Sequence, residues 1–139
     1  MKVAIEKVDH FDLGDLNVSM SLTDIGIMEF CLKVSSMIYR GTVDGKVICI
    51  WGLVPSSLLS DRAYLWLYTT KEVEEHQFIF VRHSQRMIEE MLKQFDIIVG
   101  HAHIDAPRSI RWLKWLGATF SEPDGKRIPF VIRKKNGSN

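Results

Sequence analysis

The segment that most constrains the fold of this chain is residues 96–120, which reads DIIVGHAHIDAPRSIRWLKWLGATF. Its β-branched run at positions 97–99 predicts a strand that is buried on both faces. Pro107 stands where the first residue of a helix is expected, because that position needs no N–H partner. Apolar residues then follow at helical spacing as far as Gly117, which suits a helix C-terminus. The segment therefore predicts a strand, a short helix and a second strand.

The rest of the chain carries further strand and helix patterns. Alternating or apolar runs predict strands at 2–8, 39–42, 46–53, 63–70, 118–121 and 128–133. Asp44-Gly45 predicts a tight hairpin turn, and Gly52 predicts a bulge or a close backbone approach. Helical spacing predicts a long helix at 77–95 and another at 21–36, started by Ser21 or Thr23. The apolar face expected for the latter consists of Ile27, Phe30, Cys31 and Val34.

This order predicts one α/β (α+β) domain over residues 1–139, with a frayed tail from about residue 134. We expect a single mixed, mostly antiparallel sheet with helices on both faces, since strand–helix–strand units require a crossover. The formal net charge of +1 provides no general field to attract nucleic acid or an anionic membrane. No apolar run is long enough to span a bilayer, and no secretion signal opens the chain. Cys31 and Cys49 are expected to be free, buried thiols.

The element order, together with the block IRWLKWLGA at 110–118, resembles the GNAT N-acetyltransferase fold. More narrowly, three features resemble the internal virion protein A type of short-tailed (podovirus) bacteriophages. These are MLKQF at 91–95, the aromatic strand at 63–70 and the block IRWLKWLGATF. The similarity extends over about residues 63–120, and it implies a GNAT-like fold in a phage protein.

The GNAT resemblance implies two chemical features that this sequence lacks. These enzymes hold the acetyl-CoA pyrophosphate on backbone amides of a Gly-rich turn before a helix, but no glycine lies between Gly52 and Gly100. Carboxylates of Glu72, Glu74 and Glu75 stand there instead. At the position of the acid tyrosine stands Leu113, which cannot move a proton, and the motif's Asn corresponds to Ala106. We therefore expect no catalytic residue and no cofactor.

An active protein would need its chemistry from other residues. Under that alternative the cofactor is acetyl-CoA, and the base is His101 or His103. The resemblance then places the cofactor beside Leu67 and Tyr68 on the aromatic strand and beside Arg82 and Arg86 on the following helix.

His101, His103 and Asp105 alternate along the predicted strand, so their side chains share one face. The spacing is compatible with a metal site or a general base. Hydrogen-bonded packing of the histidines, with Asp105 as the N-cap of the next helix, is the simpler interpretation. We expect no metal.

The helix that begins at Pro107 carries a basic stripe with two tryptophans. The stripe consists of Arg108, Arg111 and Lys114, and it lies beside Trp112 and Trp115. Basic and aromatic residues together are typical of protein interfaces and of single-stranded nucleic-acid sites, and a plain solvated helix face is also compatible. The low net charge favours a protein partner over nucleic acid.

These observations predict a non-catalytic GNAT-fold bacteriophage protein. It would act by protein–protein contacts in the virion, as an internal, ejection or tail-associated component, or during virion assembly. Its partners would be other phage structural proteins and a second copy of itself, in the host cytoplasm during synthesis and then in the virion. The alternative is a divergent acetyl-CoA-dependent N-acetyltransferase.

Overall fold

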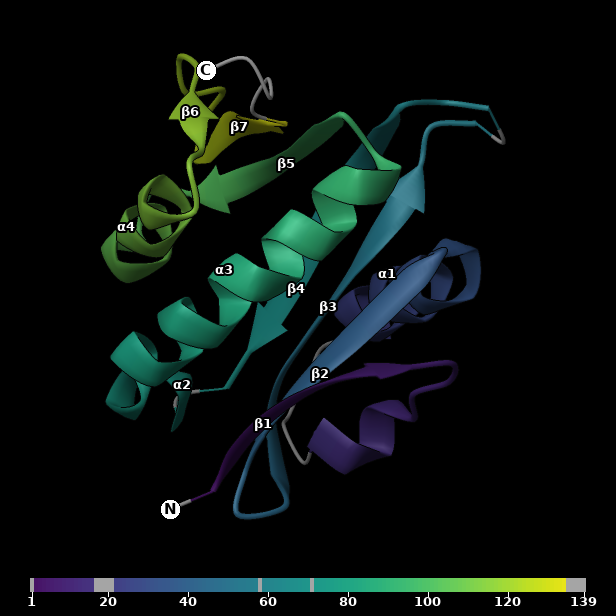
Figure 1. The fold of residues 1–139 in the computed structure, drawn as a ribbon, viewed down its shortest axis with the longest axis vertical. Helices are drawn as coiled ribbons and strands as arrows, with labels where there is room; N and C mark the ends of the chain where they lie inside the picture. Colours follow the sequence, from purple (N-terminus) through teal and green to yellow (C-terminus); the bar gives the residue numbers. More distant parts are fainter. Residues whose placement is uncertain (1, 17–21, 58, 71, 135–139) are drawn as a thin grey trace. The chain divides into compact units, whose positions relative to one another are not determined.

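The computed structural model describes residues 2–16, 22–57, 59–70 and 72–134. Figure 1 shows its elements in chain order. They are β1 (Val3–Val8), η1 (Leu13–Leu16), α1 (Leu22–Val34), β2 (Met37–Val43), β3 (Lys46–Pro55), β4 (Arg62–Thr69), α2 (Glu72–Glu75), α3 (Gln77–Gln94), β5 (Ile97–His103), α4 (Pro107–Trp115), β6 (Thr119–Phe120) and β7 (Arg127–Arg133).

Seven strands form one sheet in the order β1-β2-β3-β4-β5-β7-β6. β4 and β5 run parallel, whereas β1–β2, β2–β3, β5–β7 and β6–β7 are antiparallel pairs. The predicted single mixed, mostly antiparallel sheet is confirmed. The chain divides into two compact units. Unit 1 comprises Met1–Val54 and Leu65–Phe80, and unit 2 comprises Pro55–Tyr64 and Val81–Asn139.

In unit 1 the predicted hairpin between β2 and β3 is confirmed. Asp44 and Gly45 both have positive φ, 50° and 84°, as a type I′ turn requires. The bulge lies at Gly41/Thr42 on the partner strand, and not at Gly52. Gly52 instead marks a close approach, because a Cβ there would lie 2.7 Å from the Trp66 ring.

Helices cover both faces of the sheet within unit 1. A Cβ on Gly41 would lie 2.5 Å from both Cys49 Sγ and the Phe80 ring, so the start of α3 packs on the Cys49 face. Gly52 is three positions from Cys49 and therefore faces the other way, toward Trp66. On that side the Trp66 Nε1–H donates to Ser35 Oγ, just after α1, at 2.7 Å.

The apolar face predicted for α1 is wrong in part. Ile27 and Phe30 are 56% and 64% exposed, whereas Met28 is buried. Cys31 is only half-buried, while Cys49 is fully buried, and both are free thiols. Burial raises the pKa of the Cys49 thiol to about 12. Ser21 lies outside the described residues, and Thr23 falls inside the helix.

In unit 2 the helix signals around α4 are confirmed. Pro107 is in the first turn, and Gly117 has a φ of 94° just after the helix. Gly117 N–H donates to the Lys114 carbonyl and Ala118 N–H to the Leu113 carbonyl, which is the Schellman pattern. The predicted Asp105 cap is wrong, because Ala106 is the N-cap residue and no side chain caps the helix.

Strand β5 has two different faces. Ile98, Gly100 and Ala102 are buried, whereas His101 and His103, which alternate with them, are exposed. α4 packs against β5, and its Trp112 and Leu113 are buried. In the described part of the chain, no helix is both long and apolar enough to cross a membrane.

We predict that Gly52→Ala destabilises the protein by about 1–3 kcal/mol, because the added methyl group must displace the Trp66 ring. Urea unfolding followed by tryptophan fluorescence measures this loss. Gly26→Ala is the matched control, since nothing lies within 4 Å of a Cβ at that helical position. It should stabilise the protein by about 0.5–1 kcal/mol. Equal effects of the two substitutions would contradict the close approach at Gly52.

Candidate functional site

A side-chain contact between Tyr64 and His101 joins β4 to β5 in unit 2. Tyr64 Oη lies 3.2 Å from His101 Nδ1, and the two ring centroids are 5.8 Å apart. Register brings them together, because Tyr64 is paired with Val99, two residues before His101 on the same face. His101 is exposed and Tyr64 is half-buried, so the pair is accessible to a small molecule.

The hydrogen bond to Tyr64 decides which imidazole nitrogen of His101 can act as a base. If Nδ1–H donates to the phenol oxygen, Nε2 carries a free lone pair and can accept a proton. If the phenol O–H donates to Nδ1, the proton of the neutral ring stays on Nε2. Tyr64 is thus able to fix the reactive tautomer of His101.

His103 is a weaker candidate base. Its Nδ1 accepts the backbone N–H of Asp105 at 3.1 Å, and the Asp105 carboxylate lies 3.7 Å from the same nitrogen. The two contacts need opposite protonation states, and the shorter one requires a bare Nδ1. The proton of neutral His103 then sits on Nε2. Among the described residues, no group of three or more His, Cys, Asp or Glu side chains is arranged to hold a metal ion.

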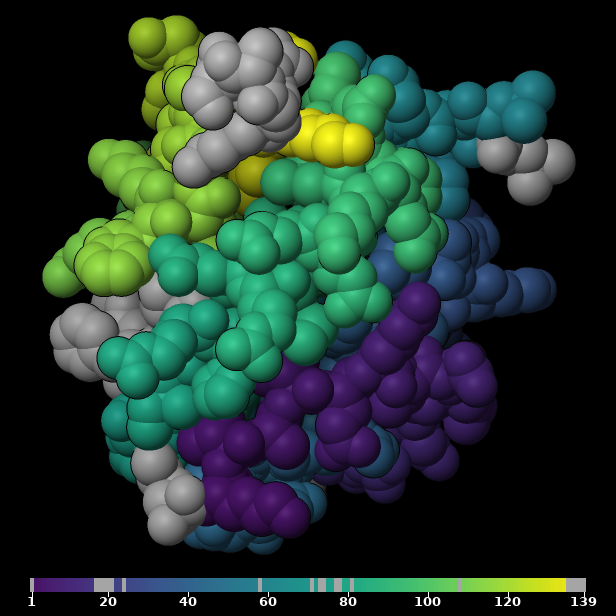
Figure 2. Space-filling model, viewed as in Figure 1, coloured from purple at the N-terminus to yellow at the C-terminus, as the bar shows by residue number. Residues whose placement is uncertain are grey.

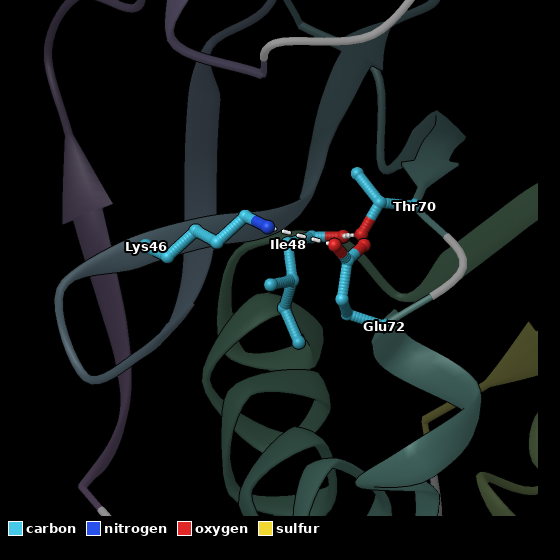
Figure 3. A network of polar contacts seen from close by, with 4 residues as sticks. All are labelled: Lys46, Ile48, Thr70 and Glu72. Atoms are coloured by element: carbon cyan, nitrogen blue, oxygen red, sulfur yellow. Dashed lines mark hydrogen bonds and ion pairs between the residues drawn. The ribbon is translucent and has the colours of Figure 1, made fainter.

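The turn that follows β4 in unit 1 carries an ion pair. Lys46 Nζ donates to Glu72 Oε1 at 2.7 Å, as Figure 3 shows. Thr70 N–H and Thr70 Oγ1 both approach the Ile48 carbonyl oxygen at 2.9 Å, which ties the end of β4 to β3. The Thr70 hydroxyl also lies within hydrogen-bonding reach of the Glu72 carboxylate. The Glu72 carboxylate therefore ties this turn to Lys46 of β3.

These contacts stabilise the ionised form of Glu72. The hydrogen bond from Lys46 is the largest cause, followed by those from Thr70 and from the Glu72 backbone N–H, and together they lower its pKa from 4.5 to about 2. A carboxylate thus stands at the turn where the GNAT resemblance implies phosphate-binding amides. It is also the partner of a cation that would otherwise be available to a phosphate.

The other predicted cofactor contacts lie on separate elements. Leu67 and Tyr68 are half-buried on β4, in unit 1. Arg82 and Arg86 are exposed one turn apart on α3, in unit 2. At the acid position on α4, Leu113 is buried and apolar.

The partner surface predicted on α4 includes Trp112, but this residue is buried. Arg111, Lys114 and Trp115 are exposed, with Trp115 at 65%. Trp112 is only 9% exposed and belongs to the core. The Arg108 side chain lies outside the described residues. Lys114 Nζ stands 5.9 Å from the centroid of the Phe120 ring, a cation–π distance.

Comparisons with known proteins identify the fold. No family model matches the sequence, and no curated protein matches it. Solved structures do match over nearly the whole chain. A Bacillus subtilis acetyltransferase in complex with CoA has a TM-score of 0.69 at 8% identity, over 96% of this chain and 100% of that one.

The second structure is a chimera of spermidine N-acetyltransferase SpeG from Vibrio cholerae and hSSAT. It has a TM-score of 0.65 at 11% identity, over 96% of both chains. The third is the N-acetyltransferase PseH of Campylobacter jejuni with acetyl coenzyme A, at 0.62 and 9%, over 96% of this chain and 100% of that chain. The protein therefore has the GNAT fold. These comparisons give no support to the phage interpretation, which rests on sequence resemblance alone.

We predict that Glu72 makes stability depend on pH in the acid range. Because its folded-state pKa is lowered, ionised Glu72 stabilises the protein above pH 4.5, and this contribution is lost as the pH falls toward about 2. Glu72→Gln should lower Tm near neutral pH, and the difference from the wild type should shrink over that window. The difference should also shrink in high salt, because the pair is exposed. Glu75→Gln is the control at an exposed position of the same turn, and an equal loss in both variants would contradict the role of the pair.

Proposed function

We propose that the protein is a divergent N-acetyltransferase in which His101 accepts the proton of an amine substrate. The observation that carries this proposal is the Tyr64–His101 pair, with 3.2 Å between Oη and Nδ1 on an accessible face of β5. The GNAT fold supports it, because structures of this fold include acetyltransferases in complex with CoA or acetyl coenzyme A. The fold by itself does not fix the reaction.

In this proposal Tyr64 and His101 have different roles. Tyr64 accepts the Nδ1–H hydrogen bond and holds the imidazole in the tautomer with a bare Nε2. His101 Nε2 then takes the proton that the amine nitrogen loses when it is acylated. Acetyl-CoA would supply the acetyl group as a thioester, and its sulfur would leave as a thiolate that takes a proton from solvent when the C–S bond breaks. At the position of the acid tyrosine on α4, Leu113 has no proton to give.

The turn after β4 does not fit a pyrophosphate in the way the fold resemblance implies. It has no glycine, and the Glu72 carboxylate already occupies Lys46. We therefore assign no cofactor contact to that turn. The exposed Arg82 and Arg86 of α3 are the candidate phosphate contacts in unit 2.

Calorimetry with acetyl-CoA and mass spectrometry of spermidine or a lysine-containing peptide after incubation test this proposal. We expect heat on binding and a mass gain of one acetyl group. His101→Gln should lower the turnover rate by about 10²-fold or more and leave cofactor binding unchanged. His103→Gln is the control and should change the rate little. No heat at millimolar acetyl-CoA, or equal loss in both variants, would refute the assignment.

A second candidate is a non-catalytic contact role in a phage particle, as the sequence resemblance implies. The carboxylate at the turn and the buried Leu113 at the acid position are compatible with its non-catalytic part, and the phage part rests on the sequence resemblance alone. Its partners would be other phage structural proteins or a second copy, and it would pass from the host cytoplasm into the virion.

Mass spectrometry of purified phage particles tests this second candidate. If the protein is a virion component, its peptides persist through density-gradient purification in constant ratio to the capsid protein. Its absence from particles that assemble in cells making the protein would exclude that role.

A further inference from the structure

A groove in unit 2 lies away from the Tyr64–His101 pair. It has a volume of about 430 Å³, and the second half of α3, the end of α4 and the end of β7 line it. Its apolar residues are Ile88 and Leu92 of α3, Leu116 after α4 and Ile132 of β7. In Figure 2 the second half of α3 is green and α4 is yellow-green.

The polar residues that line the groove are mainly cationic. Lys93, Arg133 and Lys134 carry positive charge, whereas Glu89 is the one acid among the described lining residues, so the excess is two charges (three minus one). Asp96 partly offsets Lys134, whose Nζ lies 4.0 Å from its carboxylate. All four lining charges are exposed, so they can meet a partner without a large desolvation cost.

One wall of the groove is Trp115, which is 65% exposed. Its indole is exposed at the edge of the groove. Tryptophan is one of the residue types that contribute most to binding energy at protein interfaces. Lys114 precedes it and Arg111 lies one turn earlier, both exposed, so the positive charge continues along α4. Trp115 belongs both to the groove and to the exposed face of α4, so the two form one continuous surface.

We propose that this groove binds an acidic segment of another protein, with an apolar side chain of that segment packed against Trp115 and Leu92. Charge decides the class of partner, because an excess of lysine and arginine around an apolar floor complements aspartate and glutamate beside a leucine or phenylalanine. The proposal does not depend on acetyl transfer, and it extends the predicted surface from α4 to α3 and β7.

Two other occupants fit the groove less well. A nucleic acid would match the charges, but it would leave the half-buried Leu92 facing a phosphate backbone instead of an apolar side chain, while Ile88 and Ile132 beneath it are buried. A second copy that used the same surface would place lysines against lysines. The chain's own residues 135–139 add one lysine and no acid, so they do not complement the groove either.

The test uses a fluorescein-labelled peptide, Asp-Glu-Leu-Asp-Asp-Phe-Glu-Asp, and fluorescence anisotropy with the full chain. We expect saturable binding that weakens with salt, and weak or no binding of the neutral peptide Asn-Gln-Leu-Asn-Asn-Phe-Gln-Asn. Lys93→Glu and Trp115→Ala should each weaken binding by about tenfold or more. Both positions are exposed, and circular dichroism checks that the variants remain folded. Lys7→Glu, the same charge change at an exposed position of β1 in unit 1, should leave binding within about twofold.

Three results would overturn the proposal. The first is equal weakening by Lys93→Glu and Lys7→Glu, which would reduce the effect to net charge. The second is tighter binding of single-stranded poly-dT than of the acidic peptide, with loss of that binding in Trp115→Ala. The third is no peptide binding together with self-association of the wild type that Trp115→Ala abolishes.

Discussion

The two faces of β5 are the constraint on which the rest of this protein depends. Because side chains alternate along a strand, burial of Ile98, Gly100 and Ala102 on one face places His101 and His103 on the other. α4 packs against β5, and its Trp112 and Leu113 are buried whereas its Trp115 is exposed. A shift of one residue in the register of β5 would bury the histidines and expose the core.

The fold of this protein and the arrangement of the turn after β4 depend on different physical features. The fold depends on the sheet, on the Pro107 start and on the Gly117 stop of α4, and all of these are present. The phosphate-binding chemistry of the resemblance depends on bare backbone at one turn, where this chain instead places the Lys46–Glu72 pair. An internal carboxylate satisfies the local cation, so this turn needs no external anion to be stable.

Sequence patterns predicted the elements better than the contacts between them. The hairpin at Asp44-Gly45 and the α4 boundaries followed from local backbone preferences, which act within a few residues. The face of α1 did not follow, because the helix sequence LTDIGIMEFCLKV is apolar on nearly every side and spacing cannot choose one.

The Tyr64–His101 pair was missed for a different reason. It depends on the register Tyr64↔Val99 between strands that lie far apart in the sequence, and no single segment encodes that register. The sequence shows only that His101 and His103 alternate along one strand and that the strand at 63–70 is aromatic, which does not say which residues face each other. The Asp105 cap was wrong because the backbone N–H of Asp105 bonds to the His103 ring, and the N-cap position is one residue later, at Ala106.

The most direct test of the central claim, that Tyr64 prepares His101 to act as a base, is the tautomer of that imidazole. Long-range ¹H–¹⁵N NMR of ¹⁵N-histidine-labelled protein above neutral pH distinguishes Nδ1–H from Nε2–H. We predict the Nδ1–H tautomer for His101 in the wild type and a shift toward Nε2–H in Tyr64→Phe, while His103 stays Nε2–H in both. A His101 already in the Nε2–H form, or unchanged by Tyr64→Phe, would contradict the account.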